Sequence, residues 1–217
     1  MSEERLSLET GHGPTTALVY RAEGGRPTLV LAHGAGAPQT HPWMVAMARA
    51  IAAAGVTVVT FNFLYSEHRR GAPDRAPVLE ATWLAVLDGL RGKGFGPRPF
   101  IGGKSMGGRY ASMVAAKDGV DVAGVVMLGY PLHPPGEPQK LRVDHLPEVR
   151  APMLFVQGSR DTFGTQEEIE PVVKGLPRAR LLLIEGGDHS LATPKKSGVT
   201  LPQTMARVAA EIAGFTA

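Results

Sequence analysis

Short apolar runs alternate with segments of helical periodicity along the chain, and this alternation limits the possible folds more than any other feature of the sequence. A run of a few Val, Ile and Leu residues is typical of a strand buried in a parallel sheet. Strands that alternate with helices predict an α/β fold, a three-layer α/β/α sandwich with a mostly parallel sheet, because right-handed crossovers place helices on both faces. Ligands of such folds bind at the carboxyl ends of the strands. The six predicted strands are Thr28–Ala32, Val56–Phe63, Phe100–Ile101, Val122–Leu128, Met153–Val156 and Arg180–Ile184.

The segments between these runs carry apolar residues three or four positions apart, which is the spacing of one helix face. Thr165 and Glu168 form a capping-box pattern at the start of one further helix. Residues 6–9 and 16–21 predict an antiparallel hairpin at the edge of the sheet. No repeat or linker divides the 217 residues, so we expect one domain, 1–217. The apolar stripes are Trp43, Met47 and Ile51; Leu79, Trp83, Val86 and Leu90; Tyr110, Met113 and Val114; and Met205, Val208 and Ile212.

Composition excludes several classes of function. The chain has no cysteine, which excludes disulfides, thiolate metal sites and cysteine nucleophiles. The net charge is only +3 and the basic residues are scattered, so nucleic acid is not an expected partner. No apolar run approaches the roughly 20 residues that cross a bilayer, and the acidic start of the chain argues against a secretory signal. We therefore expect a cytoplasmic protein that does not bind membranes. The histidine spacing matches no metal-binding motif, and no cofactor is expected.

Ser105 is the candidate nucleophile. It stands at the centre of Gly103-Lys104-Ser105-Met106-Gly107, a G-x-S-x-G pentapeptide that follows a predicted strand and precedes a predicted helix. A nucleophile elbow requires this strand-turn-helix context. The same residues match the end of a phosphate-binding loop, but Arg98 stands where that motif needs its first glycine, and Pro99 removes a backbone donor. An inert glycine-rich turn is the remaining alternative.

A serine nucleophile needs a general base and an orienting carboxylate, because its hydroxyl is hardly ionised at neutral pH. In an elbow-type site the chain order is serine, acid, histidine, each placed after a successive strand. Asp161 and His189 follow the last two predicted strands and fit this order. Asp161 could instead cap the next helix, but Thr165 is available for that purpose. Asp188 is adjacent to the histidine, and we expect it to shape the turn.

Two backbone N–H groups should stabilise the negative charge that develops on a substrate carbonyl oxygen. Met106, the residue after the nucleophile, is expected to supply one of them. The other is expected from His33-Gly34-Ala35-Gly36-Ala37, the small-residue loop after the first predicted buried strand. The sequence leaves the choice between Ala35 and Gly36 open.

With these residues in place, the sequence resembles the α/β-hydrolase superfamily over nearly its whole length. Residues 102–109 and 73–77 are similar to a small lidless branch that includes dienelactone-hydrolase-like bacterial proteins. Dienelactone hydrolases use a cysteine nucleophile, so Ser105 implies that their lactone substrate does not carry over. The resemblance implies a serine hydrolase that cleaves a small-molecule ester or thioester through an acyl-enzyme, with Ser105, His189 and Asp161 as its triad. Some eukaryotic relatives suggest the alternative, a catalytically silent interaction module on the same fold.

Many members of this superfamily carry a lid in the interval that corresponds to residues 129–152. Here the interval holds Pro131, Pro134, Pro135 and Pro138 and has room for little beyond one short helix near 141–149, so we expect no large cap. The expected walls of the open site are residues 130–135 and 65–76. Its basic side chains either form a solvated rim or attract anionic esters. The candidate substrate-binding residues are Lys104, Tyr130, Tyr65 and Arg69.

Overall fold

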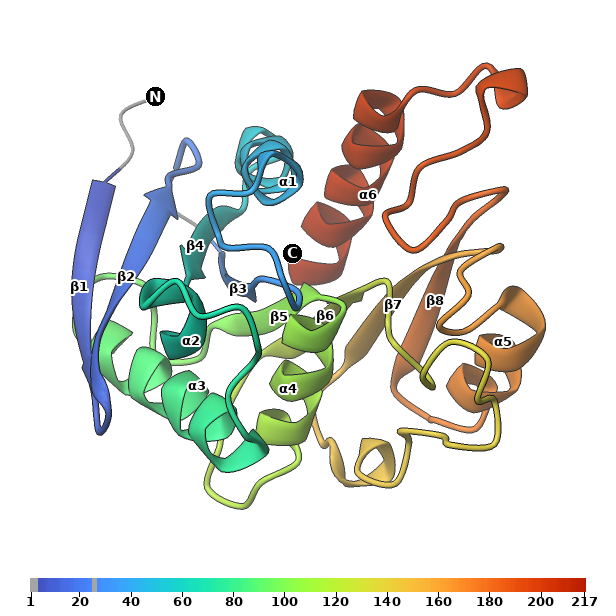
Figure 1. The fold of residues 1–217 in the computed structure, drawn as a ribbon. Helices are drawn as coiled ribbons and strands as arrows, with labels where there is room; N and C mark the ends of the chain where they lie inside the picture. Colours follow the sequence, from blue (N-terminus) through green and yellow to red (C-terminus); the bar gives the residue numbers. More distant parts are fainter. Residues whose placement is uncertain (1–3, 25–26) are drawn as a thin grey trace.

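The computed structural model describes residues 4–24 and 27–217, and within them eight strands form one sheet (Figure 1). The strand order across the sheet is β1-β2-β4-β3-β5-β6-β7-β8. The strands are β1 (Glu4–Thr10), β2 (Gly13–Tyr20), β3 (Thr28–Ala32), β4 (Thr57–Phe61), β5 (Phe100–Lys104), β6 (Gly124–Leu128), β7 (Met153–Gly158) and β8 (Ala179–Ile184). The helices are α1 (Pro42–Ala53), α2 (Leu64–Glu67), α3 (Ala76–Leu90), α4 (Met106–Ala115), α5 (Gln166–Lys174) and α6 (Leu201–Thr216).

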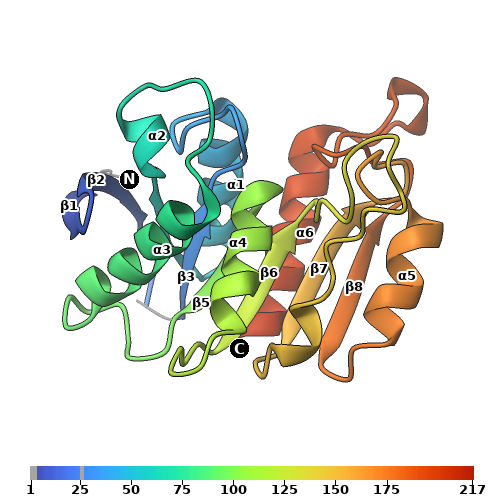
Figure 2. The same cartoon turned by 60° about the horizontal axis from the view of Figure 1, so that its bottom comes forward.

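The sheet is parallel from β4 to β8, and the predicted hairpin β1-β2 adds two antiparallel strands at one edge. From β3 the chain crosses to β4 on one side and then returns to β5 on the other side of β3. This reversal makes β3 and β5 neighbours, so the loops that follow them meet at the carboxyl edge of the sheet. The loops after β6, β7 and β8 extend the same edge, as Figure 2 shows.

Helices cover both faces of the sheet, which confirms the predicted three-layer sandwich. Helices α1 and α6 lie on one face, and α3, α4 and α5 lie on the other (Figures 1 and 2). Successive side chains of a strand point to opposite faces. In β3, Leu29 and Leu31 pack with the α1–α6 layer, whereas Val30 and Ala32 pack with α3 and α4. Each buried strand therefore contributes to two apolar cores.

The predicted capping box begins α5: Thr165 is the N-cap, and its backbone N–H donates to Glu168 Oε2 at 2.8 Å. The predicted strand Val56–Phe63 is shorter in the structure, where β4 ends at Phe61. Phe63 is instead the N-cap of α2. No helix in the described part of the chain combines the length and apolar character needed to cross a bilayer.

The interval with room for a short helix near residues 141–149 holds a three-residue 3₁₀ helix, η1 (Leu146–Glu148), and no α-helix. Pro147 has no N–H to donate to the carbonyl four residues earlier, and its ring would clash with that carbonyl. The Arg142 N–H instead donates to the Leu132 carbonyl at 2.9 Å. Residues 129–152 therefore form a loop beside the sheet edge, with no cap domain above it.

Candidate active site

Ser105 lies at the sharp turn between β5 and α4. Its backbone angles, φ 51° and ψ −117°, are outside the regions that a serine normally adopts. Gly103 and Gly107 allow the turn to close. A Cβ on Gly103 would lie 2.5 Å from the carbonyl carbon of Gly107, and a Cβ on Gly107 would lie 2.5 Å from the Ala32 oxygen. Because both clashes involve backbone atoms, no larger side chain fits at either position.

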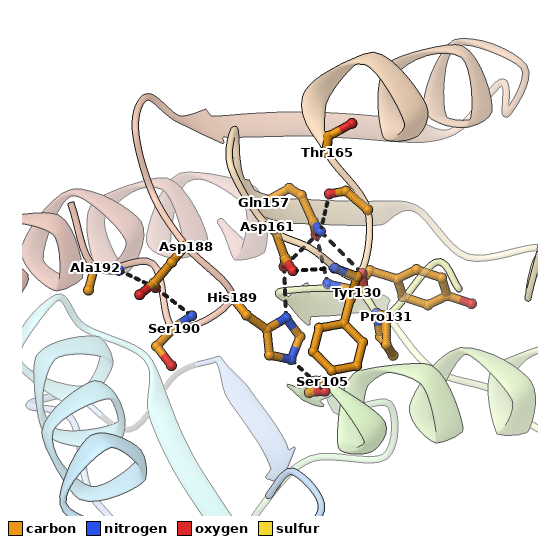
Figure 3. A network of polar contacts seen from close by, with 12 residues as sticks. Ser105, Tyr130, Pro131, Gln157, Asp161, Thr165, Asp188, His189, Ser190 and Ala192 are labelled. Atoms are coloured by element: carbon orange, nitrogen blue, oxygen red, sulfur yellow. Dashed lines mark hydrogen bonds and ion pairs between the residues drawn. The ribbon is translucent and has the colours of Figure 1, made fainter. Parts of the chain in front are cut away.

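Ser105, His189 and Asp161 form a continuous chain of hydrogen bonds (Figure 3). His189 Nε2 lies 2.8 Å from Ser105 Oγ, and His189 Nδ1 lies 2.8 Å from Asp161 Oδ2. The three residues follow β5, β8 and β7 respectively, so all three extend from the carboxyl edge of the sheet. The structure thus brings together the three side chains selected by motif and chain order.

The Asp161 carboxylate is fully buried, and both of its oxygens accept hydrogen bonds. Oδ2 accepts from Gln157 Nε2 at 3.0 Å in addition to facing His189, and Oδ1 accepts from the Phe163 N–H at 2.9 Å. A carboxylate only accepts hydrogen bonds, so Nδ1 of His189 carries the imidazole proton. This tautomer leaves Nε2 free to accept the Ser105 hydroxyl proton.

Gln157, at the end of β7, is a site residue that sequence reasoning missed. Its Oε1 accepts the Tyr130 N–H at 2.7 Å, while Nε2 donates to the Gly164 carbonyl at 2.9 Å as well as to Asp161. The side chain therefore joins the loops after β6 and β7 around the buried acid (Figure 3). The sequence offers one signal for it, a polar residue with a long side chain at the end of an apolar run.

Asp188 shapes the turn that carries His189, as its position in the sequence suggested. Its Oδ1 accepts the backbone N–H groups of Ser190 at 2.8 Å and Ala192 at 3.0 Å (Figure 3). The indole N–H of Trp43, on α1, donates to the Ser190 carbonyl at 2.9 Å. The His189 loop is therefore held from both sides, and the His189 side chain keeps 23% of its surface exposed.

His33 fixes the small-residue loop after β3. Its Nδ1 lies 2.7 Å from the Gly34 carbonyl, and its Nε2 accepts the Phe63 N–H at 3.1 Å. Burial lowers the pKa of His33 to about 4, against a weaker opposing effect of the Gly34 carbonyl. The imidazole is therefore neutral at pH 7, with Nδ1 as donor and Nε2 as acceptor.

The backbone N–H groups of Met106 and Ala35 lie near Ser105 and have no acceptor among the residues that the structure describes. Met106 is the first residue of α4, so its N–H has no partner within the helix. The Ala35 N–H makes no hydrogen bond to any residue that the structure describes. Ala35 lines the cavity beside Ser105, whereas Gly36, with φ 74°, does not.

A cavity of about 650 Å³ opens in front of Ser105 and His189. That volume suits a small organic molecule. The Phe163 ring, which forms part of the wall, stacks on His189 with 4.2 Å between the ring centroids. No group of three or more His, Asp or Glu side chains that could hold a metal ion gathers within residues 4–24 and 27–217. Apolar wall residues include Trp43, Met44, Leu79, Met106, Tyr110 and Pro131, and the cations in the wall are Lys104, Arg109 and Arg142.

A family model described as the alpha/beta hydrolase domain matches residues 25–217. The chain belongs to this family. The fold of this α/β-hydrolase is similar to that of an esterase domain from Rhodothermus marinus, with a TM-score of 0.75, 16% identity, and coverage of 99% of this chain and 98% of that one. It is similar to a dienelactone hydrolase from Anabaena variabilis, with a TM-score of 0.75, 21% identity, and coverage of 98% and 95%. It is also similar to a lidless α/β serine hydrolase from Xanthomonas campestris, with a TM-score of 0.71, 21% identity, and coverage of 88% and 87%. These matches confirm the resemblance to the small lidless branch.

Of the four candidate substrate-binding residues of this α/β-hydrolase, Lys104 alone lines the cavity. Arg69 follows the end of α2, where its φ of 55° marks a turn, and its side chain is exposed outside the cavity. Tyr65 and Tyr130 are buried and also lie behind the walls. The expected wall segments are nevertheless represented by Pro73, Asp74 and Pro131, which do line the cavity.

The two tyrosines support the walls instead of touching the cavity. The Tyr130 hydroxyl donates to the Arg142 carbonyl at 2.6 Å, which ties the middle of the loop 129–152 to its first residues, directly after β6. The Tyr65 N–H donates to Asp74 Oδ2 at 2.8 Å. A sequence pattern gives the loop that a residue belongs to, but not the direction of its side chain, and both residues turn toward the core.

Lys104 places a positive charge next to the nucleophile. Its Nζ lies 5.7 Å from the centroid of the Trp43 ring, within reach of a cation–π interaction. Burial lowers the pKa of Lys104 to about 8, while the charges of Asp161 and Asp188 act in the opposite direction. The ammonium group is therefore mostly protonated at pH 7.

Proposed function

We propose that this α/β-hydrolase is a serine hydrolase that cleaves a carboxylic ester or thioester of a small molecule. The observation that carries the proposal is the unbroken chain of hydrogen bonds from Ser105 through His189 to the buried Asp161, at the base of an open cavity. Membership of the α/β-hydrolase family supports the same class of reaction.

In the proposed mechanism, Ser105 Oγ attacks the substrate carbonyl carbon while His189 Nε2 takes the hydroxyl proton. Asp161 holds the imidazole in the required tautomer and stabilises the imidazolium that forms. His189 then gives the proton to the departing alcohol or thiol, which leaves an acyl group on Ser105. A water molecule, deprotonated by the same histidine, releases the acid in the second step.

The negative charge on the carbonyl oxygen needs donors that are already oriented. The N–H groups of Met106 and Ala35 are the proposed pair, because both border the nucleophile and neither donates to another residue in the described part of the chain. Loss of one such donor lowers a rate by about 10²- to 10³-fold. The hydrogen bonds of His33 to Gly34 and Phe63 would keep the Ala35 peptide in position.

The proposal is tested with a fluorophosphonate probe, which reacts with activated serines. Wild type should be labelled and Ser105→Ala should not, and activity of this variant on a short-chain p-nitrophenyl ester should fall by up to about 10⁶-fold. Thermal unfolding of both proteins provides the control for folding. A folded wild type that stays unlabelled would refute the proposal and favour an interaction module.

A further inference from the structure

Two arginines line the cavity without a carboxylate partner. Arg109 lies one helical turn after Ser105 on α4, where its backbone N–H donates to the Ser105 carbonyl at 3.0 Å. Arg142 lines the same cavity from the loop 129–152. Neither guanidinium pairs with an acid among the residues that the structure describes. Exposed arginines commonly lack partners, but these two are only partly exposed.

The burial of Arg109 leaves a donor unsatisfied. Its Nε has almost no contact with solvent and no hydrogen-bond acceptor in the protein. The guanidinium carbon lies 5.3 Å from the centroid of the Tyr110 ring, which stabilises the charge but uses none of the N–H donors. A buried donor of a charged group without an acceptor is costly, so Arg109 holds its charge in the cavity wall without the usual protein partner.

Among the residues that line the cavity, positively charged side chains outnumber carboxylates. Burial and the nearby charge of Arg109 lower the pKa of Arg142, which indicates that the two guanidinium groups repel each other. Asp74 also lines the cavity, but its oxygens are taken by Arg70 at 2.8 Å and by the Tyr65 N–H at 2.8 Å. Lys104 adds a third cation to the same wall. A cavity of this charge concentrates anions.

The loop that carries Arg142 is fixed before any ligand binds. The Arg142 carbonyl accepts the Tyr130 hydroxyl at 2.6 Å, and the Arg142 N–H donates to the Leu132 carbonyl at 2.9 Å. The Arg142 side chain donates from Nη1 to the Pro131 carbonyl at 3.5 Å. The backbone of Arg109 is also fixed, because it belongs to α4. A site with fixed donors binds an anion without the entropy cost of ordering a loop.

We propose that the substrate of this site carries a carboxylate that binds at Arg109 and Arg142 while its ester or thioester carbonyl lies at Ser105. The inference rests on the function proposed above and narrows it. A guanidinium matches a carboxylate with two parallel hydrogen bonds, and the apolar side chains in the wall of the same cavity suit a carbon chain. The substrate class is therefore the half-ester or half-thioester of a dicarboxylic acid.

The test compares each half-ester with a neutral compound of the same shape. Monoethyl succinate, glutarate and adipate are paired with the corresponding ethyl esters in which an amide replaces the free carboxylate, and kcat/KM is measured by titration of released acid. At the best chain length, wild type should prefer the acid over the amide by about 10- to 100-fold. High salt should reduce this preference.

Arg109→Met and Arg142→Met should each reduce the preference for the acid over the amide about tenfold or more. Arg75→Met is the matched control, because Arg75 is exposed next to Asp74, does not line the cavity, and carries the same charge. Its preference should equal that of wild type. Arg109→Lys keeps the charge but loses the planar fork, and should retain part of the preference.

Fluorophosphonate labelling of Ser105 in every variant separates the possible failures. Suppose that wild type and the variants are all labelled at the same rate. The substrate class is then wrong if wild type hydrolyses acid and amide equally, and it is also wrong if both methionine variants keep the wild-type preference for the acid. Labelled wild type that hydrolyses none of the pairs also overturns the substrate class. If folded wild type is not labelled at all, the proposed serine hydrolase function itself has failed. An unfolded Arg109→Met leaves Arg142→Met and Arg109→Lys to decide the result.

Discussion

Acidification should destabilise the fold through His33, because protonation of this imidazole breaks the hydrogen bond that it accepts from the Phe63 N–H. The pKa of His33 is about 4 in the folded protein, whereas an unperturbed histidine side chain has a pKa of 6.5. The unfolded chain therefore binds the proton first, and stability falls as the pH drops from about 6.5 to about 4. The loss is complete below the folded pKa and amounts to roughly 3 kcal/mol.

The assay is urea unfolding of wild type and His33→Gln between about pH 7.5 and about pH 4. Glutamine keeps one donor and one acceptor but does not titrate, and all other ionisable groups are shared by the two proteins. The wild-type free energy of unfolding should fall by roughly 3 kcal/mol more than that of the variant over this range. Parallel curves would refute the reasoning, and so would an imidazole ¹⁵N spectrum in which His33 titrates near its unperturbed pKa.

Three further substitutions test the site. Asp161→Asn should lower kcat about 10³- to 10⁴-fold in steady-state assays, because an amide can favour the wrong tautomer of His189. It should also lower the unfolding temperature, because the amide NH2 would face a buried donor, either Gln157 Nε2 or the Phe163 N–H. Gly107→Ala should cost at least about 2 kcal/mol in urea unfolding, since its Cβ would lie 2.5 Å from a backbone oxygen. Gly214→Ala, in an open position of α6, is its control and should be neutral or stabilising. Gln157→Leu should lower both kcat and stability, the latter by about 2 to 4 kcal/mol, because it leaves the buried Tyr130 N–H without an acceptor; an unchanged stability would contradict this account.

The layers of the fold could be predicted because each buried strand is a short apolar run with a helix-period segment after it. The order of the strands also allowed the sequence to predict the three side chains of the site, Ser105, Asp161 and His189. Parallel strands end at the same edge, so chain order alone predicts which loops meet there. The interval 129–152 has room for one short helix, and the structure holds a 3₁₀ helix there, because Pro147 prevents a longer α-helix.

Side-chain direction within a loop was beyond the reach of the sequence. Tyr65 and Arg69 belong to a segment that borders the cavity, but one is buried and the other is exposed outside it. Arg109 and Arg142 carried no motif, and only their positions in the folded chain bring them to the same cavity. The role of Gln157 could not be predicted from the sequence either, since it depends on side-chain contacts with three residues in two loops.

The distance along the chain between Ser105 and His189 has a consequence for how the protein folds. The two residues are 84 positions apart, and they meet only after β5, β6, β7 and β8 have paired in order across the sheet. Contacts of such long range form late, because the chain must first lose the entropy of closing large loops. A partly folded chain without β8 in place would hold the serine but no base. In a refolding experiment, the time at which Ser105 begins to react with a fluorophosphonate therefore reports when β8 joins the sheet.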